Sequence, residues 1–207
     1  MTKYNLKINF FLIIKILIIF HLITLSLLSY GNTTNDEHVV LGKDSAPIKI
    51  KIFSSLTCPH CANFHINVVP KIKENYVETG IVQLIFIDFP LDKAAFNASK
   101  LLHCLDQKKQ IAYLDTIYER QEKWMIGSNM DEINSNLKKI VEILGIDLKK
   151  FNKCVNDKVI ADKILNGRIQ GQEKYSINST PTIIINEKKL EGSVDFKNIK
   201  KKIEKLI

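Results

Sequence analysis

The sequence lacks the patterns that accompany cysteine-based metal and haem sites. It contains only four cysteines. The one Cys-x-x-Cys, Cys58 to Cys61, is followed neither by a second such pair nor by a spaced histidine pair, as a structural zinc site requires. Ala62 stands where covalent haem attachment needs a histidine. We therefore expect no metal and no cofactor here. A redox-active pair and a purely structural disulfide remain as alternatives.

Internal repeats and low-complexity linkers are also absent, so nothing in the sequence predicts a solenoid or a string of separate modules. The 207 residues suffice for one core of ordinary size. The formal net charge is +8, but the lysines are scattered along the expected helix faces, with one cluster near the C-terminus. Such spacing is typical of solvated surface, and we expect no nucleic-acid partner.

Residues 1–31 are predicted to be a secretory signal peptide. No acidic residue precedes Asp36, and two early lysines are followed by an almost wholly apolar run over 8–28 and small residues at 29–31. An uncleaved membrane anchor is the alternative, although Lys15 lies inside the apolar run. Either outcome places the cysteines outside the cytosol, where disulfides persist. We expect a periplasmic protein.

The stretch around the two close cysteines joins a strand to a helix. Residues 48–53 alternate apolar and basic, as in a strand with one buried face. Pro59 suits the first position of a helix, which makes Cys58 the expected N-cap. Free backbone N–H groups there stabilise a thiolate, so we predict a lowered pKa for Cys58. Cys61 lies one turn on, at an apolar position. We expect an exposed attacking thiol and a buried resolving thiol.

The flanking segments predict a small mixed sheet. A short apolar run at 38–42 is expected to be an edge strand. The helix after the cysteines is expected to be kinked, but not ended, by Pro70. Residues 81–87 form a continuous apolar strand. Strand, helix and strand then predict a parallel pair with a right-handed crossover.

A long helical stretch follows and carries the other two cysteines. Cys104 and Cys154 both lie on the apolar faces of predicted helices. In an oxidising compartment an inter-helix disulfide is the expected state, with two buried free thiols as the alternative. A last helix of this stretch is expected from about Asp157 towards Gln172, with Gly171 weakening its end.

The C-terminal part predicts a hairpin and a final helix. Pro181 stands directly before an apolar strand, where a proline fits only the strand start, and its bond to Thr180 is a candidate for the cis form. A short returning strand is expected over 189–192. Asp195 is expected to cap a helix whose buried positions include Leu206.

With Cys-Pro-His-Cys and Thr-Pro both present, the chain resembles thioredoxin-fold thiol oxidoreductases of the DsbA type. The resemblance covers the chain from about Val39 to its C-terminus, and Pro59 with His60 matches the pair between the cysteines in that group. The implied fold is α/β: a thioredoxin fold with an inserted all-helical domain. The resemblance implies two domains: a thioredoxin-fold domain over 38–90 and 176–207, and an inserted helical domain over 91–175.

The same resemblance implies roles for individual residues. Cys58 is expected to be the nucleophilic thiol and Cys61 the resolving thiol, together the redox-active disulfide, with Pro59 and His60 between them as part of the catalytic motif. Pro181 matches the cis-proline that faces the cysteine pair, and Thr180 the residue before it. Both are expected to contact substrate, by pairing of backbone groups with an extended segment.

The expected activity is the introduction of disulfide bonds into exported proteins by thiol–disulfide exchange. The resemblance implies two partners, namely unfolded exported proteins with free thiols and a quinone-linked membrane protein that restores the disulfide. We expect a monomer. Two alternatives stay open: a disulfide isomerase or reductant, and a peptide-binding chaperone without redox turnover. Only about ten residues separate Gly31 from Gly42, which leaves no room there for the dimerisation domain that isomerases of this fold usually have.

Overall fold

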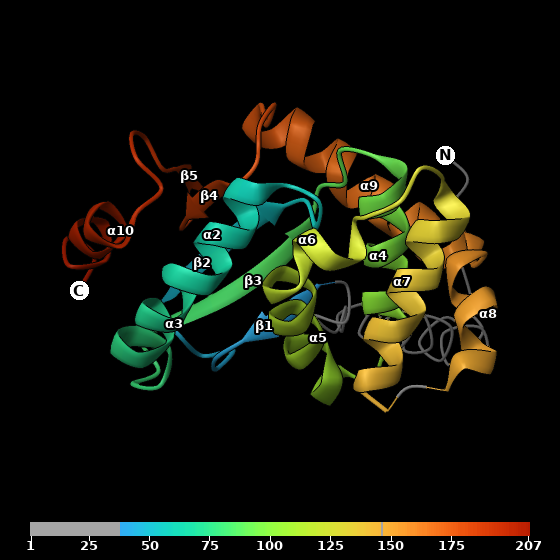
Figure 1. Cartoon of the computed structure of the whole chain (residues 1–207). Coiled ribbons are helices and arrows are strands. Elements are labelled where there is room, and N and C mark those ends of the chain that lie inside the picture. Colours follow the sequence, from blue (N-terminus) through green and yellow to red (C-terminus); the bar gives the residue numbers. More distant parts are fainter. Residues whose placement is uncertain (1–37, 146) are drawn as a thin grey trace, which may run out of the picture. The chain divides into compact units, whose positions relative to one another are not determined.

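The computed structural model describes residues 38–145 and 147–207, and the element labels used here are those of Figure 1. The predicted signal peptide, residues 1–31, lies outside the described residues. In the part of the chain that is described, no helix is both long and apolar enough to cross a membrane.

Five strands form a mixed sheet in the order β1-β3-β2-β4-β5 (Figure 1). β2 and β3 are parallel, whereas β1 pairs antiparallel with β3, β4 with β2, and β5 with β4. The strands are β1 (Val39–Leu41), β2 (Ile48–Ser54), β3 (Val82–Asp88), β4 (Thr182–Ile185) and β5 (Lys188–Lys189). The predicted edge strand and the predicted parallel pair are therefore confirmed.

The alternation in β2 decides what each side chain meets. Ile50 and Ile52 are buried in the larger core, which also holds buried residues of α2 and α10. Lys51 projects to the opposite face, where its ammonium donates to the Tyr175 hydroxyl at 2.8 Å. In the strand order β2 lies at the centre of the sheet, and the chain continues from its C-terminal end into the cysteine motif.

The helix after the cysteines is interrupted, not merely kinked. Pro70 has no N–H to donate to the carbonyl of Ile66, and the regular helix breaks at that point. The resulting elements are α2 (Pro59–Asn67), α3 (Val69–Ile72) and the π-helical turn η1 (Lys73–Val77). The prediction of one continuous helix was wrong. The predicted apolar face is nevertheless kept, with four buried residues, Phe64, Val68, Ile72 and Tyr76.

Between β3 and β4 the described chain is helical and contains no strand (Figure 1). The elements are α4 (Lys93–His103), α5 (Gln107–Glu119), α6 (Gln121–Trp124), α7 (Met130–Ile143), η2 (Leu148–Lys150), α8 (Phe151–Val155) and α9 (Lys158–Tyr175). This stretch shares the larger core with the sheet. Its division from the rest as a separate domain, residues 91–175, stays a prediction.

α9 continues beyond the position at which the sequence predicted its end. A Cβ at Gly171 would lie only 2.6 Å from a ring carbon of Phe53, so the glycine permits close approach of α9 to the sheet. Gly171 does not terminate the helix, which runs on to Tyr175. A second, smaller core forms on this side of the sheet from Phe53, Ile87, Phe89, Ile177 and Ile184.

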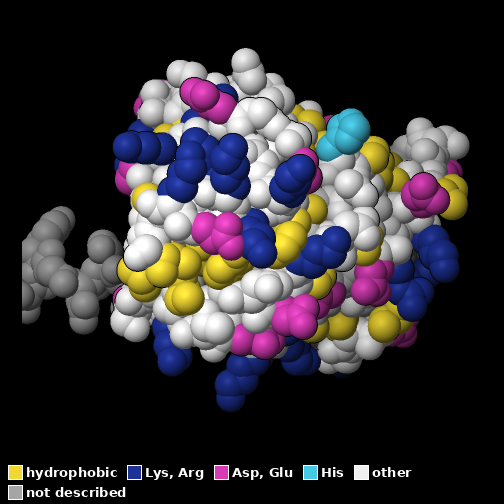
Figure 2. Space-filling view, turned by 90° about the vertical axis from the view of Figure 1, so that its left-hand side faces the viewer, with side chains coloured by type: hydrophobic (Ala, Val, Ile, Leu, Met, Phe, Trp, Pro, Cys, Tyr) yellow, Lys and Arg dark blue, Asp and Glu magenta, His cyan; other side chains and the backbone are white. Residues whose placement is uncertain are grey.

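The C-terminal helix α10 (Phe196–Ile203) follows the short β5. The Asp195 side chain accepts from the backbone N–H of Asn198 at 2.8 Å, which confirms the predicted cap. Leu206 lies beyond the helix and is 51% exposed, contrary to its predicted burial. Figure 2, viewed from the side on which α10 lies in Figure 1, shows Lys and Arg side chains with Asp and Glu side chains among them. A mixed surface of this kind is typical of a solvated face.

Candidate active site

Cys58 lies where the central strand gives way to the first turn of α2. It is the N-cap residue, with φ −81° and ψ 121°, and Pro59 occupies the first turn. The Cys58 carbonyl accepts from the backbone N–H groups of Cys61 at 3.0 Å and Ala62 at 3.1 Å. No side chain caps this helix end. The free N–H groups and the positive end of the helix dipole are therefore left to the Cys58 sulfur.

Both cysteines of the motif are in the dithiol form and both are buried. Cys61 is 1% exposed, as predicted, but Cys58 is only 8% exposed, so the predicted exposure of the attacking thiol was wrong. Local spacing placed Cys58 at the helix end but gave no measure of what covers it. His60, between the cysteines, is exposed.

The segment before β4 covers the Cys58 sulfur. The Thr180–Pro181 peptide bond is cis. The Cys58 thiol donates to the carbonyl oxygen of Thr180 at 3.4 Å. The Thr180 hydroxyl is buried and has no hydrogen-bond partner among the described residues, so it is available to donate to a thiolate. The structure thus brings Cys58, Thr180 and Pro181 together from segments about 120 residues apart.

The pKa values of the two thiols are shifted in opposite directions. For Cys58 burial is the largest influence and raises the pKa, but hydrogen bonds involving Thr180, Cys61 and His60 together outweigh it, and the net pKa is lowered. Burial raises the pKa of Cys61 to about 12. At neutral pH, Cys58 is therefore the better nucleophile and the better leaving group, while Cys61 holds its proton.

A groove with a volume of about 420 Å³ opens beside the cysteine motif. One wall comes from the start of α2 and the other from the cis-proline segment and the loop before α10. The lining residues are His60, Asn63, Phe64, Ser179, Thr180, Pro181, Val194 and Asp195. The predicted site residues His60, Thr180 and Pro181 thus share one cavity. Asn63 and Val194 had no signal in the sequence, because only the folded chain brings them to it.

Side chains of the helical stretch hold the loop that carries Cys58. The buried amide of Gln121, at the start of α6, donates to the carbonyl oxygens of Leu56 at 2.9 Å and Cys58 at 3.1 Å. Asp92, the N-cap of α4, accepts from the Thr57 hydroxyl at 2.7 Å. Sequence reasoning missed both residues, because their partners lie far away along the chain.

Tyr118 of α5 lies behind the resolving cysteine. Its hydroxyl is buried and has no hydrogen-bond partner among the described residues. Burial, and then the charge of Cys61, raise the pKa of Tyr118 well above its usual value. The ring of His65 packs against Tyr118 with the ring centroids 4.8 Å apart. Tyr118 and His65 thus place aromatic rings on the interior side of Cys61.

The other cysteines form a disulfide that joins α4 to α8. Cys104 is the C-cap of α4 and Cys154 lies in α8. Their sulfurs are bonded, and their Cα atoms are 5.8 Å apart. The bond closes a loop across 50 positions of sequence.

Two buried histidines each pair with one carboxylate. His65 Nε2 lies 2.8 Å from Asp115 Oδ1, and His103 Nε2 lies 2.6 Å from Asp88 Oδ2. Over residues 38–145 and 147–207, no group of three or more His, Cys, Asp or Glu side chains is arranged to hold a metal ion. Both side chains of the His103–Asp88 pair are buried, whereas Asp115, the partner of His65, is 56% exposed.

Known proteins resemble this chain in sequence and in fold. A family model described as thioredoxin matches residues 34–205. A probable disulfide bond formation protein D from Bacillus anthracis is 31% identical over 169 residues, which cover 80% of this chain and 76% of that protein. A putative protein-disulfide oxidoreductase of Rickettsia prowazekii is 28% identical over 176 residues, or 84% of this chain and 62% of that protein.

A solved structure gives the same result. The crystal structure of Wolbachia pipientis alpha-DsbA1 superposes with a TM-score of 0.75 and 33% sequence identity, covering 84% of this chain and 96% of that one. The predicted fold class, a thioredoxin fold with inserted helices, is confirmed by this similarity together with the sheet described above.

Proposed function

Because this chain belongs to the thioredoxin family and is a DsbA-type protein-disulfide oxidoreductase, we propose that it acts as an oxidase. In this role it introduces disulfide bonds into exported proteins through Cys58 and Cys61. The observation that carries the proposal is the opposed behaviour of the two thiols. The lowered pKa of Cys58 stabilises its thiolate and therefore the reduced pair, which makes the disulfide a good electron acceptor, while Cys61, with a pKa of about 12, keeps its proton.

The exchange begins with the Cys58–Cys61 disulfide. A substrate thiolate attacks the Cys58 sulfur, and the Cys61 sulfur leaves and takes up a proton. A second substrate thiolate then attacks the substrate sulfur of this mixed disulfide, and Cys58 leaves as a thiolate. Two substrate thiols become one disulfide, and the enzyme keeps two electrons as its dithiol.

The groove beside the cysteines supports recognition through the backbone. An extended substrate segment lying against Thr180 and Pro181 would meet backbone groups next to the Cys58 sulfur. Main-chain pairing tolerates varied side chains, as unfolded substrates require. A proposed quinone-linked membrane partner would restore the disulfide. The predicted signal peptide supports action in the periplasm, and we propose that the protein acts as a monomer.

The reduction potential of the Cys58–Cys61 pair tests the proposal. We would equilibrate residues 32–207 in glutathione buffers, trap the thiols and analyse each cysteine peptide by mass, which keeps Cys104 and Cys154 out of the count. We expect a value near that of a strong oxidant, about −120 mV. A value near that of thioredoxin, about −270 mV, would identify a reductant and overturn the oxidase proposal.

A further inference from the structure

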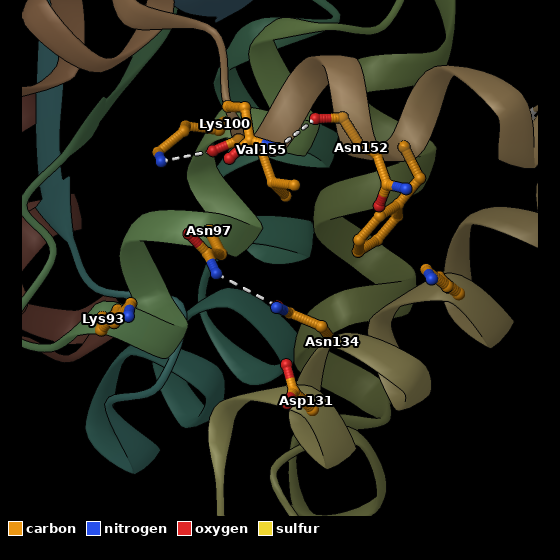
Figure 3. A pocket seen from close by; sticks show the side chains of 10 residues that line it. Lys93, Asn97, Lys100, Asp131, Asn134, Asn152 and Val155 are labelled. Carbon is orange, nitrogen blue, oxygen red and sulfur yellow. Dashed lines mark hydrogen bonds between the residues drawn. The ribbon is translucent and has the colours of Figure 1, made fainter.

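A second cavity lies in the helical region and has no assigned role. It is walled by α4, α7 and α8 and has a volume of about 410 Å³ (Figure 3). It shares no lining residue with the groove beside Cys58. Small-molecule sites in proteins span roughly 300–1,000 Å³. The cavity is therefore large enough for a compact organic ligand and is separate from the redox chemistry.

The lining carries an excess of positive charge. Lys93, Lys100 and Lys138 contribute ammonium groups, and Asp131 contributes a carboxylate. In the described ranges, no ion pair involves any of these four side chains. Burial, and secondly the charge of Lys93, lower the pKa of Lys100. The lining thus carries three ammonium groups against one carboxylate, and within the described chain none of the four is engaged in an ion pair.

Lys100 is the most constrained of the three lysines. It is only 9% exposed, its ammonium donates to the Val155 carbonyl oxygen at 2.7 Å, and it lies 4.4 Å from the centroid of the Phe96 ring. Both partners are neutral. A buried charge is costly unless an opposite charge accompanies it. An anion in the cavity would supply the missing counter-charge.

The other polar residues suit an oxyanion that also carries hydroxyl groups. Figure 3 shows the side chains of Asn97 and Asn134 pointing toward each other, and the Asn97 amide donates to the Asn134 carbonyl oxygen at 3.0 Å. Asn152 adds a further amide. Ammonium and amide N–H groups both donate to phosphate oxygens. The carboxylate of Asp131 repels an anion but accepts hydrogen bonds from hydroxyl groups.

We propose that the cavity between α4, α7 and α8 binds a small phosphate monoester that carries hydroxyl groups. The phosphate lies towards Lys93, Lys100 and Lys138, and the hydroxyl-bearing part lies towards Asp131. The cavity volume of about 410 Å³ is more than ten times the roughly 30 Å³ that one water molecule occupies in the liquid. A bare phosphate ion would therefore leave much of the cavity unfilled. The site is independent of the proposed oxidase role.

Titration calorimetry of the purified protein at low ionic strength tests the site, with glycerol 3-phosphate as the probe and inorganic phosphate and glycerol as separate arms. Lys100→Met removes the buried charge and should weaken binding at least roughly tenfold. Lys93→Gln alters an exposed side chain at the start of α4, and should weaken binding by about three- to fivefold. Lys71→Gln, on α3 and outside the cavity, makes the matched charge change and should leave affinity within twofold.

We expect saturable binding of glycerol 3-phosphate at one site, weaker binding of inorganic phosphate and none of glycerol. Asp131→Asn should reduce the preference for the ester over inorganic phosphate. The absence of saturable binding would overturn the proposal, as would equal weakening by Lys71→Gln and Lys93→Gln. Equal affinity for inorganic phosphate would overturn the assignment of a hydroxyl-bearing ligand. The thiol-exchange rate should be unchanged in Lys93→Gln.

Discussion

The two cysteine pairs of this chain lie at opposite ends of their helices. Cys58 is the N-cap of α2, where free N–H groups and the positive end of the dipole favour a thiolate. Cys104 is the C-cap of α4, where the dipole is negative and a thiolate is disfavoured. Cys58 also faces the cis-proline segment, whereas Cys104 is bonded to Cys154. The same residue type is therefore suited to exchange in one place and to cross-linking in the other.

The separation of the partners along the chain reinforces this difference. Cys58 and Cys61 are three residues apart within one helical turn, so opening their disulfide releases little chain entropy. The other disulfide spans 50 positions and restrains much of the helical stretch. In the chain-entropy account, a loop of that length gives a stabilisation of about 4 kcal/mol. One pair can open and close at small cost to the fold, and the other cannot.

Removing the attacking thiol should have the largest effect on the difference between the two cysteine pairs. Cys58→Ser should lose all catalysed oxidation of a reduced peptide, because no other free thiol lies at a helix N-terminus beside a cis-proline in the described chain. Peptide oxidation in glutathione buffer, followed by mass analysis, measures this. Cys61→Ser is the matched control and should accumulate the mixed disulfide on Cys58. Residual turnover in Cys58→Ser would move the chemistry to the other pair.

Removing the second disulfide should affect stability and spare the chemistry. The double change Cys104→Ala with Cys154→Ala should lower the free energy of unfolding by up to about 4 kcal/mol, because the unfolded chain regains its freedom. Urea unfolding measures the loss, with the intact protein as reference. Peptide oxidation through Cys58 should stay within twofold. A parallel fall in oxidation rate would show that the two pairs are coupled.

The hydrogen bonds from Gln121 predict smaller effects, one on the stability of the fold and one on the pKa of Cys58. Gln121→Met keeps the side-chain length but removes both donors, which should cost about 1–3 kcal/mol of stability. The Cys58 carbonyl then loses one restraint, the N–H groups are less well aimed at the sulfur, and the Cys58 pKa should rise. Urea unfolding and the pH dependence of Cys58 alkylation measure the two effects.

The matched control for this position is Gln110→Met. Its amide makes only long contacts, at 3.4 Å, to the carbonyl oxygens of Leu102 and Leu105. The change should leave the alkylation profile of Cys58 untouched. A loss of stability in Gln121→Met without any rise in the Cys58 pKa would mean that Gln121 supports the fold alone and does not position the thiol.

The sequence alone was sufficient to predict the features that depend on neighbouring residues along the chain. Pro59 fixes the start of α2 and therefore the N-cap role of Cys58, and the alternation before it fixes β2. The parallel pairing of β2 with β3 followed from a strand, a helix and a second apolar strand. Pro70 was misjudged because its effect depends on whether the surrounding packing keeps one helix or allows a break.

The remaining features depend on contacts between distant segments. Gln121 is an ordinary polar residue in the sequence and gains its role only when α6 meets the loop before α2. The burial of Cys58 depends on Thr180, 122 positions away. Gly171 was expected to weaken the end of its helix, because nothing near it in the sequence predicts the approach of the Phe53 ring. Spacing rules describe single elements, whereas these properties arise where elements meet.

The pH dependence of alkylation should distinguish the two thiols of the reactive pair without any change to the sequence. The Cys58 pKa is lowered, so its alkylation should reach half its maximal rate at a lower pH than an ordinary thiol, while Cys61, with a pKa of about 12, should stay unreactive at neutral pH. Peptide mass analysis after brief alkylation measures both rates in one sample. Equal profiles for the two cysteines would contradict the assigned roles.

The pKa shifts of Cys58 and Cys61 also determine whether the stability of the dithiol protein rises or falls with pH. A lowered folded-state pKa stabilises the fold fully above the ordinary thiol pKa, and that contribution is lost as pH falls through the folded-state pKa of Cys58. The raised pKa of Cys61 acts oppositely, but only above the ordinary thiol pKa of about 8.5. Below pH 8 the dithiol form should therefore lose stability relative to the disulfide form as pH falls, and urea unfolding of both forms measures the difference. Cys104 and Cys154 are bonded to each other and do not titrate, so they do not contribute to the change in that difference with pH.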